Sequence, residues 1–214
     1  MRYEIVNGVL LLWNSLFCGV AGLYFWLIKR YKTEKKKWMH RMQFSASALL
    51  FCDAMAYLFE GRPGPLGYWV VRVGNFGVFF LVELTLLLFH RYICATLLTQ
   101  EEAAALKRVQ IVRAVCWAGL ALVVVSQFTG LYYTFDAANV YHRAGGYFIS
   151  MCLPILSMLL DASLLLQYET RISSLMFLAM GSYFVLPLIA SSIQAVHYGW
   201  ALIDLAIGIS MVLM

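Results

Sequence analysis

The sequence predicts an all-α, polytopic integral membrane bundle of about seven transmembrane helices. Hydrophobic residues occupy 63% of the 214 positions and charged residues only 13%, with a mean hydropathy of +0.78. A soluble domain of this size carries roughly 45–50% apolar and ~25% charged residues, so the surplus here is more than a compact globule can bury. Because no charged stretch is long enough to be a soluble domain, residues 1–214 are predicted to form one transmembrane helical domain.

Apolar runs follow one another along the chain, and each approaches the ~20 residues that an α-helix needs to cross a bilayer. The first run, Val6 to Ile28, is longer than the apolar part of a cleaved signal sequence. Charges or turn residues separate the later runs, as at Gly61-Arg62-Pro63-Gly64-Pro65, Gly145-Gly146 and Glu169-Thr170-Arg171. Helices are therefore predicted at residues 6–28, 43–59, 70–90, 112–133, 147–167, 174–197 and 200–214 or beyond.

The last predicted helix is short. From Trp200 to Met214 an α-helix rises about 22 Å, which is less than the ~30 Å hydrocarbon core. We therefore expect the chain to stop inside a helix and to be the membrane half of a longer protein whose cytoplasmic output domain is absent.

Basic residues predict the orientation. Seven of the 16 Lys and Arg residues lie between Lys29 and Arg41, and all connections on that side of the membrane together hold twelve, against four on the other side. Basic residues are enriched in cytoplasmic loops, so the N-terminus is predicted outside and the C-terminus inside, in a plasma membrane. The same clustering explains the net charge of +5 without a nucleic-acid partner.

Charged residues at membrane depth cost about 2.5–3.5 kcal/mol each on insertion scales and need a protein or water partner. Those predicted here are Asp53, Glu83, Asp161 and Asp204, with Arg72 near the outer boundary. At 100° per residue, polar residues align on single helix faces. The aligned sets are Arg72, Asn75, Phe79 and Glu83; Ser150, Pro154, Ser157 and Asp161; Asn7, Asn14 and Cys18; and Tyr183, Pro187 and Gln194.

Amides and acids concentrate in the outer half, which predicts an outward cavity for a small polar or cationic ligand. The predicted ligand contacts are Asp53, Arg72, Asn75, Gln127 and Gln194. Glu83, Asp161 and Asp204 are predicted to be buried polar coupling residues, and Arg72 is expected to pair with Asp53 or Asp204. Two alternatives remain open: the polar residues only join helices through hydrogen bonds, or they form a proton path.

The sequence contains no recognisable catalytic set, cofactor motif or metal site. The five cysteines are scattered and unpaired, and each of the four histidines stands alone, so zinc is not expected. His90 is interpreted as an interfacial residue. No lysine follows Lys107, which excludes a retinal protein. The chain as given is predicted to have no enzymatic activity.

Several polar islands carry a family resemblance. Residues 126–136 (SQFTGLYYTFD) and 141–147 (YHRAGGY) resemble the outer loop of the seven-helix membrane region of bacterial sensor histidine kinases. They are still more similar to the membrane halves of gut-bacterial GGDEF-type diguanylate cyclases, as are residues 51–61 and 205–211. The chain has Arg143-Ala144-Gly145 where that pattern has Arg-Gly-Pro.

This resemblance implies a sensory module, typically a homodimer, that detects an extracellular or membrane-borne ligand and transmits to a cytoplasmic diguanylate cyclase or histidine kinase domain. The alternative is a small proton-coupled or small-solute transporter that uses Glu83 and Asp161. Such carriers usually contain internal repeats, and the sequence shows none.

Overall fold

The computed structural model describes residues 2–27, 33–196 and 200–214, with side chains for all of these except residues 2–4 and 194–196. The elements in chain order are α1 (Arg2–Leu27), α2 (Glu34–Phe59), α3 (Pro65–Leu97), α4 (Gln100–Ala105), α5 (Lys107–Thr129), β1 (Tyr133–Phe135), β2 (Tyr141–Arg143), α6 (Tyr147–Gln167), the 3-10 helix η1 (Glu169–Arg171), α7 (Ser174–Val196) and α8 (Leu202–Leu213).

Six of these helices, α1, α2, α3, α5, α6 and α7, are long and apolar enough to cross a membrane. They confirm the predicted all-α class and a multi-pass membrane protein. The seventh predicted span corresponds to α8, which has 12 residues and therefore rises only about 18 Å. Seven crossings and the orientation of the chain stay predictions.

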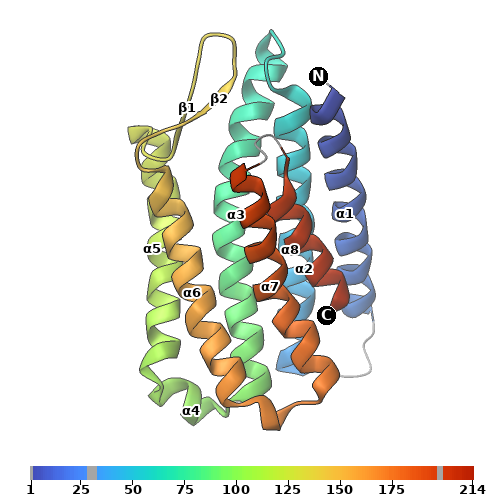
Figure 1. Ribbon diagram of the computed structural model, residues 1–214, viewed down its shortest axis with the longest axis vertical. Coiled ribbons are helices and arrows are strands. Elements are labelled where there is room, and N and C mark those ends of the chain that lie inside the picture. The colour runs from blue at the N-terminus through green and yellow to red at the C-terminus, as the bar shows by residue number, and fades with distance from the viewer. Residues whose placement is uncertain (1, 28–32, 197–199) are drawn as a thin grey trace.

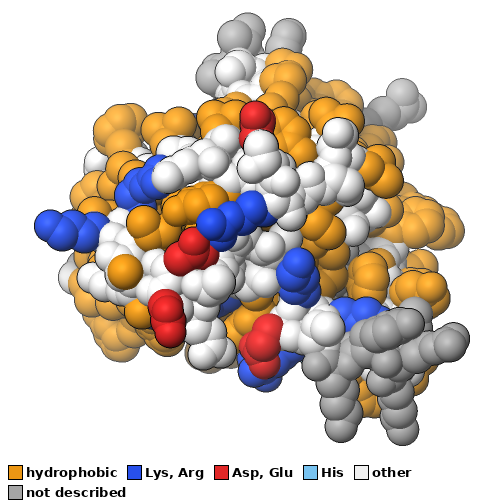
Figure 2. Space-filling view, turned by 90° about the horizontal axis from the view of Figure 1, so that it is seen from below, with side chains coloured by type: hydrophobic (Ala, Val, Ile, Leu, Met, Phe, Trp, Pro, Cys, Tyr) orange, Lys and Arg blue, Asp and Glu red, His pale blue; other side chains and the backbone are white. Residues whose placement is uncertain are grey.

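The long helices run side by side in one bundle (Figure 1). α3 packs between α2 on one side and α5 and α6 on the other, while α8 packs against α1, α2 and α7. The β1–β2 hairpin lies at one end of the bundle and α4 at the other, and we refer to these as the hairpin end and the α4 end. Viewed from the α4 end, Lys, Arg, Asp and Glu side chains gather on the end face while apolar side chains surround it (Figure 2).

Three helices, α2, α3 and α5, differ from their predicted bounds by five residues or more at one or both ends. α2 begins at Glu34 rather than residue 43 because its first turns are lysine-rich, and lysine favours helix while it stays solvated. α3 extends the prediction of 70–90 at both ends and reaches 33 residues. α5 covers 107–129 rather than 112–133, since Gly130 adopts a left-handed conformation with φ of 64° and ends the helix.

The α4 end is fixed by a charged contact between two short helices. Thr99 and Glu102 form a capping box at the start of α4, and the Glu102 carboxylate accepts hydrogen bonds of 2.7 and 2.8 Å from the Arg171 guanidinium of η1. The Arg171 hydrogen bonds, with help from the Thr99 backbone, lower the pKa of Glu102 to about 2. This contact ties the connection after α3 to the connection between α6 and α7.

α8 is held by polar side chains that reach its backbone. Asn14 of α1 donates to the Leu205 carbonyl at 3.0 Å, Cys18 lies 3.6 Å from the Gly208 carbonyl, and Gln43 of α2 donates to the Met211 carbonyl. The polar face predicted on the first helix is therefore the face toward α8. Gly208 permits this close approach, because a Cβ there would lie 2.4 Å from the Asn14 amide nitrogen.

We expect Gly208→Ala to lower the melting temperature of the detergent-solubilised protein, because overpacking costs about 1–3 kcal/mol. Gly181→Ala in α7 is the matched control. A Cβ at that position meets nothing within 4 Å, so it should gain helix propensity without a clash. Equal melting temperatures for the two variants would contradict the close packing of α8.

Candidate functional site

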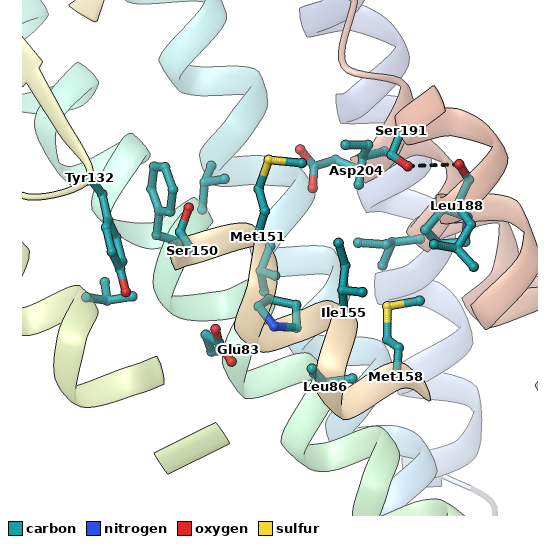
Figure 3. A pocket seen from close by; sticks show the side chains of 18 of the residues that line it. Glu83, Leu86, Tyr132, Ser150, Met151, Ile155, Met158, Leu188, Ser191 and Asp204 are labelled. Atoms are coloured by element: carbon teal, nitrogen blue, oxygen red, sulfur yellow. Dashed lines mark hydrogen bonds between the residues drawn. The ribbon is translucent and has the colours of Figure 1, made fainter. Parts of the chain in front are cut away.

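A cavity of about 200 Å³ lies inside the bundle, between α3, α6, α7 and α8, with single residues from α5 and the hairpin segment (Figure 3). Apolar side chains form most of its wall. The polar side chains that line it are Glu83, Tyr132, Tyr147, Ser150, Tyr183, Ser191 and Asp204. Two of these residues, Glu83 and Asp204, are acids, and Figure 3 places them on different sides of the same cavity.

Glu83 is the more deeply buried of the two acids. Its residue is 3% exposed, and its Oε2 atom has no hydrogen-bond partner among the described residues. Gly119 of α5 makes room for the carboxyl group, because a Cβ at that position would lie 2.5 Å from the carboxyl carbon. A carboxylate without a cation at membrane depth is costly, so this position calls for a proton or a positively charged partner.

Asp204 reaches the cavity from the first turn of α8 and hydrogen-bonds to Asp53 of α2. A carboxylate oxygen only accepts hydrogen bonds, so this contact requires a proton on one of the two groups. The other Asp53 oxygen, Oδ2, is buried and has no partner in the part of the chain that the structure describes. The predicted contact residue Asp53 therefore touches the cavity only through Asp204.

The expected pairing of Arg72 with Asp53 or Asp204 is wrong. The Arg72 guanidinium donates to Asn139 Oδ1 at 2.6 Å and stacks 3.5 Å above the Tyr68 ring. Arg72 belongs to a separate hollow at the hairpin end, which Gln127 also lines. The Tyr68 ring and the Asn139 amide stabilise the guanidinium at the end of the bundle, so the charge does not have to lie at membrane depth.

The remaining predicted contacts also lie away from the cavity. Gln127 hydrogen-bonds to the Tyr133 hydroxyl at 2.9 Å, and Asn75 donates to the Val71 carbonyl of its own helix at 2.8 Å. The side chain of Gln194 lies outside the described residues. Of the eight predicted site and coupling residues, the structure thus places Glu83 and Asp204 at the cavity.

Asp161 lies beyond the cavity toward the α4 end and is paired with His90. The Asp161 Oδ1 and His90 Nδ1 atoms are 2.7 Å apart, and both side chains are fully buried. His90 is therefore not the interfacial residue that the sequence suggested. The sequence could have indicated this position, because His90 follows Glu83 by seven residues on α3 and residues seven apart share a helix face.

Tyr132, which directly precedes β1, lines the cavity on the side of the hairpin end. The Tyr132 backbone nitrogen donates to Ser126 Oγ at 2.9 Å, and the Tyr133 ring stacks on Phe79 with centroids 5.0 Å apart. The Tyr141 nitrogen donates to Glu60 Oε1 at 3.0 Å, which ties the hairpin to the end of α2. This hairpin could not be predicted from the sequence, since three-residue strands leave no periodic pattern.

Comparison of the chain with protein-family models, with curated proteins and with solved structures finds no match.

We expect His90→Leu to destabilise the protein by about 3–5 kcal/mol, because it leaves the Asp161 carboxyl buried without its partner. The double variant His90→Leu, Asp161→Leu should recover part of this loss in thermal unfolding. His142→Leu is the matched control, because His142 and Asp136 form a similar contact of 2.9 Å with side chains 54% and 41% exposed. If His142→Leu lowered the free energy of unfolding as much as His90→Leu does, burial would not explain the cost of losing the His90 contact.

Proposed function

We propose that this chain is the sensory membrane module of a bacterial signalling protein in the plasma membrane, and that its cavity binds a small organic cation. The observation that carries the proposal is Glu83, a buried acid that lines the cavity with one carboxylate oxygen unpartnered. None of the ion pairs found among the described residues includes Glu83 or Asp204. A cationic ligand would supply the missing charge.

Several of the polar groups around the cavity offer hydrogen-bond acceptors. Besides the two acids, Pro154 and Pro187 line the wall, and a proline within a helix leaves the carbonyl four residues earlier without its amide partner. The hydroxyls of Ser150 and Ser191 are already donated to the carbonyls of Tyr147 and Leu188. These acceptors favour a ligand that donates hydrogen bonds and carries positive charge.

The size and the apolar wall of the cavity further restrict which ligands fit. At about 200 Å³ it is smaller than the 300–1,000 Å³ of typical drug-binding pockets. The rings of Tyr132, Tyr147 and Tyr183 line it, and aromatic faces attract cations. A small alkyl- or aryl-ammonium ion fits these features better than a sugar or an anion does.

The signal would pass from the cavity to the output domain through α8. This helix carries Asp204 at the cavity, while α1 and α2 hold its backbone through Asn14, Cys18 and Gln43. A cation that contacts both Glu83 and Asp204 would compete with Asp53 for Asp204. The ligand can change the packing of α8 only if it binds one arrangement more tightly than the other. By the resemblance noted above, the recipient is a diguanylate cyclase or histidine kinase domain, in a homodimer.

A second function, proton-coupled transport, is favoured by one observation. The buried His90–Asp161 pair lies on the α4 side of the cavity, so titratable groups continue from Glu83 toward that end of the bundle. Uptake of the bound cation into proteoliposomes would support a transport function, whereas binding without uptake would support a sensory function.

The binding test uses butylammonium, which carries three N–H donors, and its uncharged isostere butan-1-ol as ligands for the purified protein. We expect the cation to raise the melting temperature, since ligand at 100 times its Kd stabilises by about 2.7 kcal/mol, and the isostere to have little effect. Glu83→Gln removes the charge with little change in shape and should weaken binding at least tenfold.

Asp136→Asn is the control, because Asp136 is an exposed acid on the hairpin. It should bind the cation as the wild type does. Equal binding of the cation and the isostere, or undiminished binding by Glu83→Gln, would overturn the proposal.

A further inference from the structure

A second group of reactive side chains lies at the α4 end of the bundle, outside the ligand cavity. His90 Nδ1 is 2.7 Å from Asp161 Oδ1, and the other ring nitrogen, Nε2, is 3.6 Å from the Cys94 sulfur. When Nδ1 donates its proton to the Asp161 carboxylate, Nε2 is left as an acceptor for the Cys94 S–H. The three residues thus stand in the order nucleophile, base and orienting acid.

The environment of Cys94 differs from that of the other four cysteines. Cys18 and Cys116 are completely buried, Cys152 is exposed, and Cys52 is partly exposed but has no imidazole contact among the described hydrogen bonds. Cys94 is partly exposed and is the cysteine that contacts an imidazole among the described hydrogen bonds. It therefore combines a base with access from outside, which a reactive thiol needs.

A hollow of about 390 Å³ adjoins this group. His90, Arg91 and Cys94 of α3 line it together with Gln100 of α4 and Arg113 of α5. The Arg91 guanidinium carbon lies 5.7 Å from the centre of the Trp38 ring. The Arg113 side chain forms no hydrogen bond or ion pair with the described residues. Guanidinium groups are well suited to phosphate oxygens, so the hollow favours an anionic reactant.

The position of Cys94 along α3 indicates where a product would go. Cys94 lies three residues before the end of the helix at Leu97, and this end of α3 lies at the α4 end of the bundle (Figure 1). A cysteine at this boundary between apolar sides and a charged end is a typical site of lipidation. An acyl chain attached there would have lipid within reach, and each buried CH₂ contributes about 0.8 kcal/mol to membrane binding.

We propose that Cys94 accepts an acyl group from a fatty-acyl thioester whose carrier bears phosphate groups. His90 takes the proton from the Cys94 thiol, and the sulfur attacks the carbonyl carbon of the donor. The tetrahedral intermediate then breaks the bond between this carbon and the carrier sulfur. The carrier leaves as a thiol with the proton from His90, and Cys94 becomes a thioester. Asp161 is a positioning residue that orients His90, while Arg91 and Arg113 hold the phosphates.

The test incubates the full chain in liposomes with palmitoyl-coenzyme A and identifies acylated peptides by mass spectrometry. We expect a hydroxylamine-labile acyl group on Cys94 that Cys94→Ser removes and Cys152→Ser leaves in place. His90→Gln should slow acylation at least 100-fold at neutral pH, since a positioned base contributes 10²–10⁴. Its residual rate should rise with pH as the unassisted thiol ionises.

Arg113→Gln separates a binding role from a structural one and leaves the buried pair intact. It should raise the concentration of donor needed for half-maximal rate while the reaction of Cys94 with neutral N-ethylmaleimide stays unchanged. Acylation of Cys94 no faster than that of Cys152, or a rate that His90→Gln leaves unchanged, would overturn the proposal. So would a Cys94 that reacts with maleimide but takes no acyl group.

Discussion

The structure depends on one constraint: a polar group within the apolar part of the bundle must find its partner inside the protein, because hydrocarbon offers none. Asn14 and Gln43 meet it by donating to carbonyls of α8, and Ser45 meets it through Thr85 at 2.8 Å. His90 Nδ1 and Asp161 Oδ1 partner each other. Asp53, Glu83 and Asp161 each keep one buried carboxyl oxygen without a partner among the described residues. Of these three acids Glu83 is the one that lines the cavity, and it gives the cavity its chemical character.

Hydropathy alone located the long helices, because the solvent imposes both their length and their composition. Hydropathy does not locate helix ends and short elements that lie in water. The lysine-rich start of α2, the cap at Gly130 and the capping box of α4 are local features that no apolar run marks. The hairpin depends on contacts such as Tyr141 with Glu60, which are 81 residues apart, and such pairings are invisible to a single sequence.

The candidate site was predictable in part. Helical spacing correctly put Phe79 with Glu83, Ser150 with Pro154, and Tyr183 with Pro187 on shared faces, and all six line one cavity. Spacing cannot say which faces meet, so Arg72 and Gln127 were grouped with residues that lie elsewhere. It also missed the partner of His90, 71 residues away. The faces of single helices follow from the sequence, whereas their pairing requires the fold.

The central claim is that the Glu83 cavity is a space with acidic groups in a mostly apolar wall that small cations can enter, rather than a packed helix interface. Substituted-cysteine accessibility in liposomes tests it most directly, with Ser150→Cys at the cavity wall and Leu159→Cys, an exposed position on the apolar surface of α6. Both are made in a background in which Cys52, Cys94 and Cys152, the cysteines that are not fully buried, are replaced by serine. A small, water-soluble, cationic thiol reagent should modify position 150 much faster than position 159, and should do so more slowly once Glu83 is replaced by Gln. Equal, slow modification of both positions would contradict the account.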